Sequence, residues 1–151
     1  RAAAVSWALP NQRICLPMSE ARTVQNPGEF PAEHVEFLLR GPAGMIECAV
    51  DVPEEDEARR GTVIICHPHP EHGGTMHNKV VTIMERSMRE LGLRTVRFNF
   101  RGVGDSEGCY DEGRGEVRDI EAAAAWLRGV SLGTCVHSAI TSRRGFSARR
   151  C

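Results

Sequence analysis

The sequence contains no long apolar run, no excess of charge of either sign and no paired cysteine motif. Its apolar stretches fall far short of the roughly 20 residues that cross a bilayer. Residues 1–17 have neither the apolar core nor the cleavage pattern of a secretory signal. The formal net charge is only −1, which argues against nucleic acid or an anionic membrane as a partner. We therefore expect a cytoplasmic protein that binds neither.

The six cysteines have no regular spacing and form no Cys-x-x-Cys pair. In a chain of 151 residues this pattern argues against a disulfide framework and against a zinc ribbon. Hydrophobic residues make up 41% and charged residues 26% of the chain, which is typical of a globular protein with one core. The composition thus predicts a single domain with reduced thiols.

Local patterns divide the chain into three regions. Residues 20–30 are polar and broken by Asn26-Pro27-Gly28, and the chain before Met18 does not begin with methionine. We predict residues 1–30 as a leader, with Met18 as a plausible start, and residues 31–128 as the folded part. Residues 129–151 show no clear periodicity and end in a basic, Ser/Arg-rich stretch, so we predict an atypical tail.

The folded part has the order of elements of an α/β protein. Residues 34–40 and 45–52 flank turn residues and predict a β-hairpin, whose second strand alternates between a buried and an exposed face. Residues 62–66 and 94–100 predict strands of a parallel sheet, and helices are predicted near 80–91 and from about 116. Helical spacing places Val80, Ile83, Met84, Ser87, Met88 and Leu91 on the inner face of the first helix, and Val117, Ile120, Ala124 and Leu127 on that of the second.

Two loops carry a resemblance to a known family. Residues 67–76 (HPHPEHGGTM) follow the first parallel strand, and residues 99–108 (NFRGVGDSEG) follow the second. Together with the elements around them, over about residues 35–128, they resemble the N-terminal half of the α/β-hydrolase superfamily, in particular its short bacterial predicted serine hydrolases. The resemblance implies a partial α/β-hydrolase fold, truncated before or at the nucleophile elbow. It also implies hydrolysis of an ester, amide or related acyl bond in a small molecule, with no cofactor.

The first loop matches the place of the oxyanion hole in that superfamily. One backbone N–H of this loop stabilises the negative charge that develops on the substrate oxygen during acyl transfer. The two prolines of the loop have no N–H to offer, so the resemblance implies His69 as the donor. Gly73, Gly74 and Thr75, near the start of the helix, remain alternatives.

The second loop is not a dinucleotide-binding fingerprint. Glu107 stands where the third glycine of that fingerprint would be, and a loop follows instead of a helix. We expect Arg101, Asp105 and Ser106 to be hydrogen-bonding residues of a turn and not catalysts.

The nucleophile of the superfamily lies in Gly-x-Ser-x-Gly, on a sharp turn between a strand and a helix. Residues 129–133 (GVSLG) match these letters and make Ser131 the candidate. However, the second predicted helix runs directly into them and no apolar strand precedes them. Either a strand has been deleted, or the reading frame departs from the family near Gly129. We favour the second explanation, with Ser131 as a chance match or a remnant. The triad would then be incomplete in this chain.

Two alternatives belong to other functional classes. His67, His69, Glu71 and His72 resemble the His-x-His-x-Asp-His motif of the metallo-β-lactamase superfamily, in which bound zinc activates water. The glutamate in place of aspartate and the stiff prolines make this the weaker interpretation.

The chain could also be a non-catalytic, truncated protein. A sheet that stops after its second parallel strand leaves the far edge of that strand open, which predicts self-association through this edge.

Overall fold

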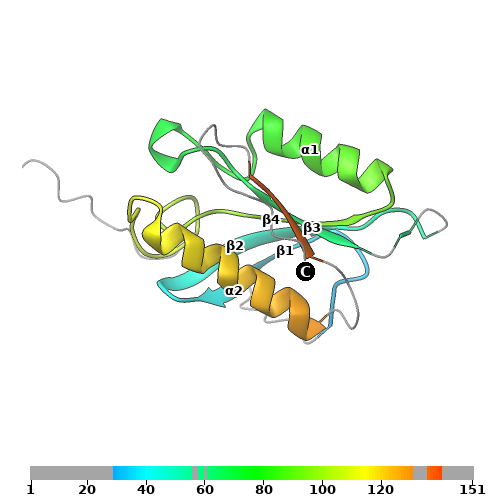
Figure 1. Ribbon diagram of the computed structural model, residues 1–151, viewed down its shortest axis with the longest axis horizontal. Helices are drawn as coiled ribbons and strands as arrows, with labels where there is room; N and C mark the ends of the chain where they lie inside the picture. Colours follow the sequence, from blue (N-terminus) through cyan, green and yellow to red (C-terminus); the bar gives the residue numbers. More distant parts are fainter. Residues whose placement is uncertain (1–28, 56–57, 60, 131–135, 141–151) are drawn as a thin grey trace, which may run out of the picture.

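The computed structural model describes residues 29–55, 58–59, 61–130 and 136–140, the last segment by its backbone alone. The elements follow in the order β1 (Val35–Gly41), β2 (Gly44–Asp51), β3 (Thr62–Cys66), the 3₁₀ turn η1 (Pro70–His72), α1 (Lys79–Glu90), β4 (Arg94–Phe98), α2 (Arg114–Val130) and β5 (Val136–Ile140). The strands form one sheet in the order β1-β2-β4-β3-β5 (Figure 1). β2 runs antiparallel to both of its neighbours, whereas β3 runs parallel to β4 and to β5. The predicted partial α/β fold is confirmed.

The predicted hairpin is present as β1 and β2, which pair along their whole length. The expected alternation of buried and exposed residues in β2 is only half right. Glu47 and Ala49, expected on the exposed face, are buried like the apolar residues that alternate with them. The reason is that the second loop packs over this face and forms hydrogen bonds with Glu47.

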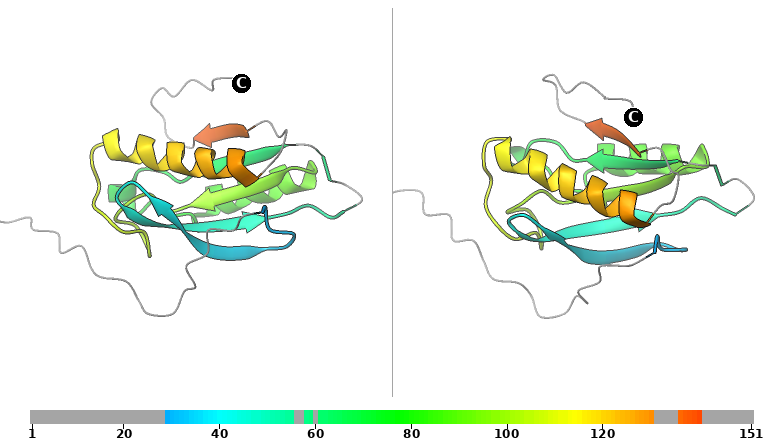
Figure 2. Two further views of the ribbon diagram at one scale, coloured as in Figure 1. Left: turned by 90° about the horizontal axis from the view of Figure 1, so that it is seen from below. Right: turned by 60° about the horizontal axis from the view of Figure 1, so that its bottom comes forward.

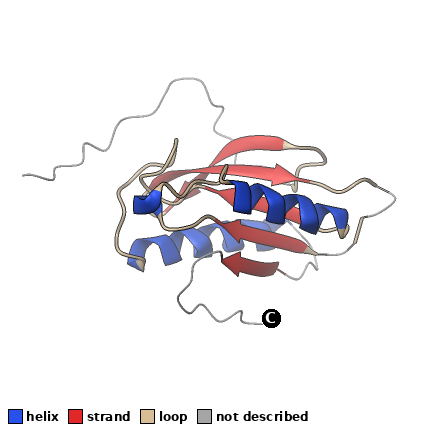
Figure 3. Ribbon diagram, turned by 90° about the horizontal axis from the view of Figure 1, so that it is seen from above, coloured by secondary structure: helices blue, strands red, loops and turns tan. Residues whose placement is uncertain are grey.

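The two helices lie on opposite faces of the sheet (Figure 2). In Figure 3, seen from above, α1 is in front of the sheet and α2 is behind it. The larger core cluster, which includes Ile64, Phe98 and Leu127, lies on the side of α2. A smaller cluster, which includes Val63 and Val81, lies on the side of α1. Because successive side chains of a strand point to opposite faces, β3 is buried on both, as its continuous apolar run predicted.

The inner face of α1 is only partly as predicted, since Met84 and Met88 pack against the smaller core cluster as expected. Three residues expected to face the core are more than half exposed: Val80 (54%), Ile83 (54%) and Leu91 (53%). Instead, Val81 and Glu85 are buried against the sheet. The inner face is therefore rotated toward Val81 and Glu85, with Met84 and Met88 still on it. In the folded chain Arg89 binds the carboxylate of Glu85 at 3.0 Å, which compensates for its burial.

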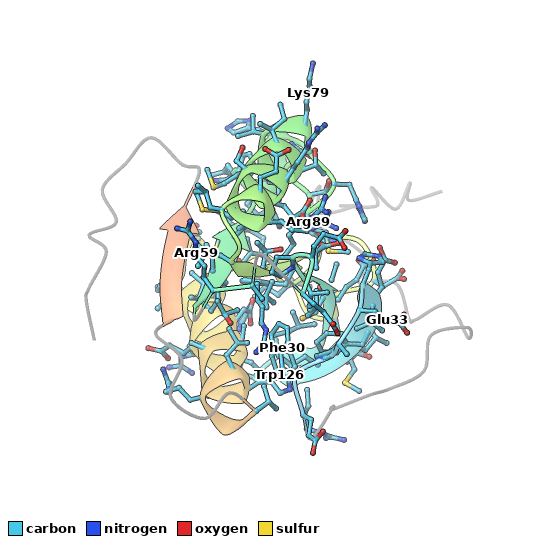
Figure 4. All side chains as sticks on the ribbon, turned by 90° about the vertical axis from the view of Figure 1, so that its right-hand side faces the viewer. Phe30, Glu33, Arg59, Lys79, Arg89 and Trp126 are labelled. Atoms are coloured by element: carbon cyan, nitrogen blue, oxygen red, sulfur yellow. The ribbon has the colours of Figure 1, made fainter. Side chains whose placement is uncertain are left out.

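Helix α2 begins at Arg114, close to the prediction, and buries Leu127 as expected. Trp126 packs on Phe37 and Phe30, with ring centroids 5.1 and 6.1 Å apart, and Figure 4 shows Phe30 and Trp126 side by side. Phe30 thus belongs to the folded part, because it buries an aromatic ring against the core. Residues 1–28 of the predicted leader, with Met18, lie outside the described residues.

The segment predicted as a tail contains a strand. β5 pairs in parallel with β3, from Val136 opposite Thr62 to Ile140 opposite Cys66. The sequence of β5 mixes small, polar and apolar residues, so no apolar run marked it.

The far edge of β4, predicted to be open, is occupied by β2 of the hairpin. Among the described strands, the outer ones are β1 and β5.

The thiols only partly follow the prediction. Cys48 and Cys66 are buried thiols outside any disulfide bond, and burial raises the pKa of Cys66 to about 12. Cys109, in contrast, is disulfide-bonded. Sequence spacing misses such a bond, because a disulfide requires only closeness in space. No helix in the described part of the chain is both long enough and apolar enough to span a membrane.

Candidate active site

Two loops meet at the carboxyl ends of β3 and β4. These strands are parallel neighbours, with Cys66 opposite Phe98, so residues 67–78 and 99–113 leave the sheet at the same edge. In Figure 1 both segments lie at the left-hand end of the sheet. This edge is where open α/β sheets bind ligands. The loops carry every site residue that the sequence predicted except Ser131, which lies outside the described residues.

His67 joins the two loops as a buried, neutral imidazole. Its Nε2 accepts a hydrogen bond from the backbone N–H of Phe100 at 3.0 Å. Nδ1 therefore carries the proton and donates to the carbonyl of Pro68 at 2.6 Å. Burial lowers the pKa of His67, which favours this neutral form. Both ring nitrogens are engaged within the protein, so His67 has a structural role.

Asn99 and Glu47 hold the second loop on β2. The Asn99 side chain accepts a hydrogen bond from the N–H of Met76 and donates one to Glu47, both at 2.7 Å. Ser106 Oγ donates to the carbonyl of Asn99 at 2.6 Å and accepts from the N–H of Glu47 at 2.9 Å. The N–H of Asp105 also donates to Glu47, at 2.9 Å. Ser106 thus holds the turn together and Asp105 takes part through its backbone, as predicted.

Arg101 ties the second loop to α2. Its Nε and Nη2 donate to the two carboxylate oxygens of Asp119 at 3.0 and 2.8 Å, and its backbone N–H donates to the same group at 3.2 Å. The Asp119 side chain is fully buried, and its hydrogen bond raises the pKa of Arg101. A bidentate arginine–carboxylate pair fixes orientation as well as distance, so Arg101 is a structural residue, as expected.

The backbone N–H groups of the first loop differ in whether they are already used. Gly73 and Gly74 donate to carbonyls of the loop itself at 3.1 and 3.2 Å. Thr75 donates to Asn78 Oδ1 at 3.1 Å. The N–H of His69 has no acceptor in the part of the chain that the structure describes. Of the four donors that the sequence left open, only this one is available to a bound group among the described residues.

The two glycines shape the loop. Gly73 has a φ of +74°, in the left-handed region that side chains other than glycine rarely adopt. A Cβ atom at Gly74 would overlap the carbonyl group of Pro68. Glycine is therefore required at both positions for the tight path of the chain from β3 to α1.

The side chain of His69 is bonded at both nitrogens. Nδ1 accepts a hydrogen bond from the N–H of Glu71 at 3.3 Å. Nε2 therefore carries the proton and donates to the hydroxyl of Tyr110 at 2.9 Å. The two rings are tilted, with centroids 5.1 Å apart. Sequence reasoning did not single out Tyr110, because no motif spacing marks it and its contact exists only where the two loops meet.

The structure does not bring the three predicted zinc ligands together. His67 is buried with both nitrogens bonded, whereas His69 and His72 are exposed, with ring centroids 5.0 Å apart. Within the described ranges, no group of three or more His, Cys, Asp or Glu residues is arranged to hold a metal ion. The zinc interpretation therefore has no set of ligands among these residues.

Several known proteins are similar to this chain. XC6422 from Xanthomonas campestris, an α/β serine hydrolase without a lid, is 47% identical with a TM-score of 0.73, over 76% of this chain and 53% of that chain. An α/β serine hydrolase homologue from Coxiella burnetii is 46% identical with a TM-score of 0.72, over 76% and 54%. The uncharacterized protein RP471 of Rickettsia prowazekii is 39% identical over 93 residues, which are 62% of this chain and 38% of RP471. No protein-family model matches the chain.

The chain spans about half the length of the two solved structures and less than half of RP471. Within that span, the hairpin, the parallel strands and the two loops agree with the resemblance that the sequence indicated. The chain is therefore related to the α/β-hydrolase superfamily and has part of the fold of that superfamily.

Proposed function

We propose that the chain carries the oxyanion-hole loop of a serine-type hydrolase, which cleaves an ester, amide or related acyl bond in a small molecule. Its similarity to two α/β serine hydrolase structures at 46–47% identity supports this reaction class. The observation that carries the proposal is the N–H of His69, the candidate donor without an acceptor among the described residues. It stands in the loop that forms the oxyanion hole in this superfamily.

The chemistry needs such a donor at a fixed place. Attack on an acyl carbon converts the carbonyl oxygen into an oxyanion, and a preorganised N–H stabilises that charge without having to reorient. The neighbouring carbonyl of His69 is fixed, because it accepts hydrogen bonds from His72 and Gly74 at 3.1 and 3.2 Å. The peptide on the N–H side follows Pro68, whose ring restricts its φ. The second donor of the hole would come from the residue after the nucleophile.

Ser131 is the candidate nucleophile from the sequence motif, but the order of the helices and strands around it argues against this role. Elbow serines follow a strand and precede a helix, whereas Ser131 follows α2 and precedes β5. Because β5 is parallel to β3, the beginning of β5 lies at the end of the sheet opposite the His69 loop. The carboxyl end of β5 lies at the same end of the sheet as the His69 loop. We therefore expect the nucleophile for this oxyanion hole to follow the carboxyl end of β5.

Even an incomplete triad should leave a measurable rate. The oxyanion hole and substrate binding alone accelerate acyl hydrolysis by about 10³–10⁴ over water in enzymes that have lost a triad residue. The test is hydrolysis of p-nitrophenyl acetate by the purified chain, together with Ser131→Ala and a chelator control. We expect turnover above the buffer rate that survives both changes. Loss in Ser131→Ala would make Ser131 the nucleophile, and loss with chelator would favour zinc. No turnover above buffer would contradict the proposal.

A further inference from the structure

We infer that Tyr110 is a positioning residue for the oxyanion-hole donor. Its hydroxyl holds the ring of His69, and through that ring it holds the backbone N–H of the same residue. The inference rests on the proposed function, since it explains how the donor on which that function depends is kept in place. Tyr110 acts through His69 and does not itself need to touch the substrate.

The first loop provides little other support on the N–H side of residue 69. His69 lies between two prolines, which limit the backbone but cannot donate a hydrogen bond. Its side chain is exposed, and within its own loop the ring centroid lies 5.0 Å from that of His72 and the ring accepts one long hydrogen bond, 3.3 Å, from the N–H of Glu71. The 2.9 Å hydrogen bond that Nε2 donates to the hydroxyl of Tyr110 is shorter and involves the opposite ring nitrogen. With both nitrogens bonded, the ring has one tautomer and one orientation.

Tyr110 is presented by a segment that is itself anchored. The next residue, Asp111, donates its N–H to Glu116 at 2.9 Å, and Gly113 donates to the other oxygen of the same carboxylate at 2.8 Å. Glu116 is buried in the first turn of α2. The hydroxyl of Tyr110 therefore holds His69 from outside the first loop, on a segment that is hydrogen-bonded to α2.

This geometry affects the transition state more than the ground state. A donor that is correctly oriented before the reaction stabilises the developing oxyanion, whereas the neutral carbonyl of the bound substrate gains less from it. Loss of the hydroxyl should therefore lower kcat and leave KM nearly unchanged. The effect should be that of one neutral hydrogen bond, about a 2- to 10-fold reduction.

The test compares wild type with Tyr110→Phe, which keeps the ring and removes only the hydroxyl. Ser87→Ala, which removes an exposed hydroxyl from α1, is the matched control. With p-nitrophenyl acetate, we expect Tyr110→Phe to lower kcat by about 2- to 10-fold with KM unchanged, and Ser87→Ala to change neither. In a His69→Ala background the Tyr110→Phe change should have no further effect, because the ring through which Tyr110 acts is gone.

A second readout separates this inference from the proposed function. Amide hydrogen exchange of Glu71 and Gly74, which donate to His69, should be several-fold faster in Tyr110→Phe and unchanged in Ser87→Ala. If wild type shows no ester turnover, the proposed function fails and exchange alone decides the role of Tyr110. Unchanged exchange in Tyr110→Phe, or an equal kcat loss in the His69→Ala background, would overturn the inference.

Discussion

Replacing Asp119 by alanine should be one of the most destabilising single changes in this protein. Three donors of Arg101 converge on this carboxylate, at 2.8, 3.0 and 3.2 Å. The Asp119 side chain has no exposed surface, and the Arg101 side chain keeps only 12% exposure. Removing one partner of a buried ion pair leaves an uncompensated charge and costs about 3–5 kcal/mol. We expect about 3 kcal/mol, the lower end of that range, because the guanidinium retains some access to water.

Urea unfolding followed by circular dichroism measures this loss directly. The double variant Asp119→Ala/Arg101→Ala should be more stable than the sum of the two single losses predicts, because no unpaired charge then remains. Glu90→Ala is the control, since it breaks an exposed pair, Arg86–Glu90, of the same 2.8 Å length and should not shift the midpoint measurably. An Asp119→Ala midpoint equal to that of wild type, or strict additivity in the double variant, would refute the reasoning.

Three further predictions concern the core, pH and the first loop. Val81→Ala should cost about 2 kcal/mol of unfolding free energy and Val80→Ala almost nothing; equal costs would mean that the inner face of α1 is misassigned. Because burial lowers the pKa of His67 below its unfolded value of about 6.5, stability should be fully present above pH 6.5 and fall as the pH drops below it. A His67→Gln variant should show a smaller fall in urea midpoint between pH 7.5 and 5.5, and an undiminished fall would contradict this. Gly74→Ala should cost about 1–3 kcal/mol, whereas Gly129→Ala in the open end of α2 should stabilise by about 0.5–1 kcal/mol; the same sign for both, in urea unfolding, would argue against a steric role for Gly74.

Local patterns were sufficient where one property determined the structure. The apolar run of β3 predicted a strand buried on both faces, and the turn at residues 41–44 predicted the hairpin of β1 and β2. Local patterns failed where contacts between distant parts of the chain decide which residues are buried or paired. On α1, apolar spacing alone did not place Glu85 on the inner face, where its ion pair with Arg89 compensates for burial. β5 was missed because its residues form no apolar run.

For the candidate site, the sequence indicated which loop and which donors to consider, but not the contacts that the folded chain makes around them. The absence of an N–H on proline and the family resemblance of the loop after β3 reduced the candidate donors to His69, which was favoured, and three alternatives. Sequence could not separate His69 from Gly73, Gly74 and Thr75, because the acceptors that occupy those three N–H groups are set by the folded path of the loop. The contact of His69 with Tyr110 is still further from sequence, because it joins residues 41 positions apart.

The most direct test of the oxyanion-hole assignment is a comparison of His69→Pro with His69→Ala. Residue 69 has φ −49° and ψ 124°, close to the φ of about −65° that proline requires, so proline removes the N–H with little change of path. Alanine removes the ring but keeps the N–H. We expect p-nitrophenyl acetate turnover in His69→Pro to be about 100-fold below that of His69→Ala, the usual loss for one oxyanion-hole donor. Equal rates in the two variants, with both folded by circular dichroism, would contradict the assignment of the His69 N–H.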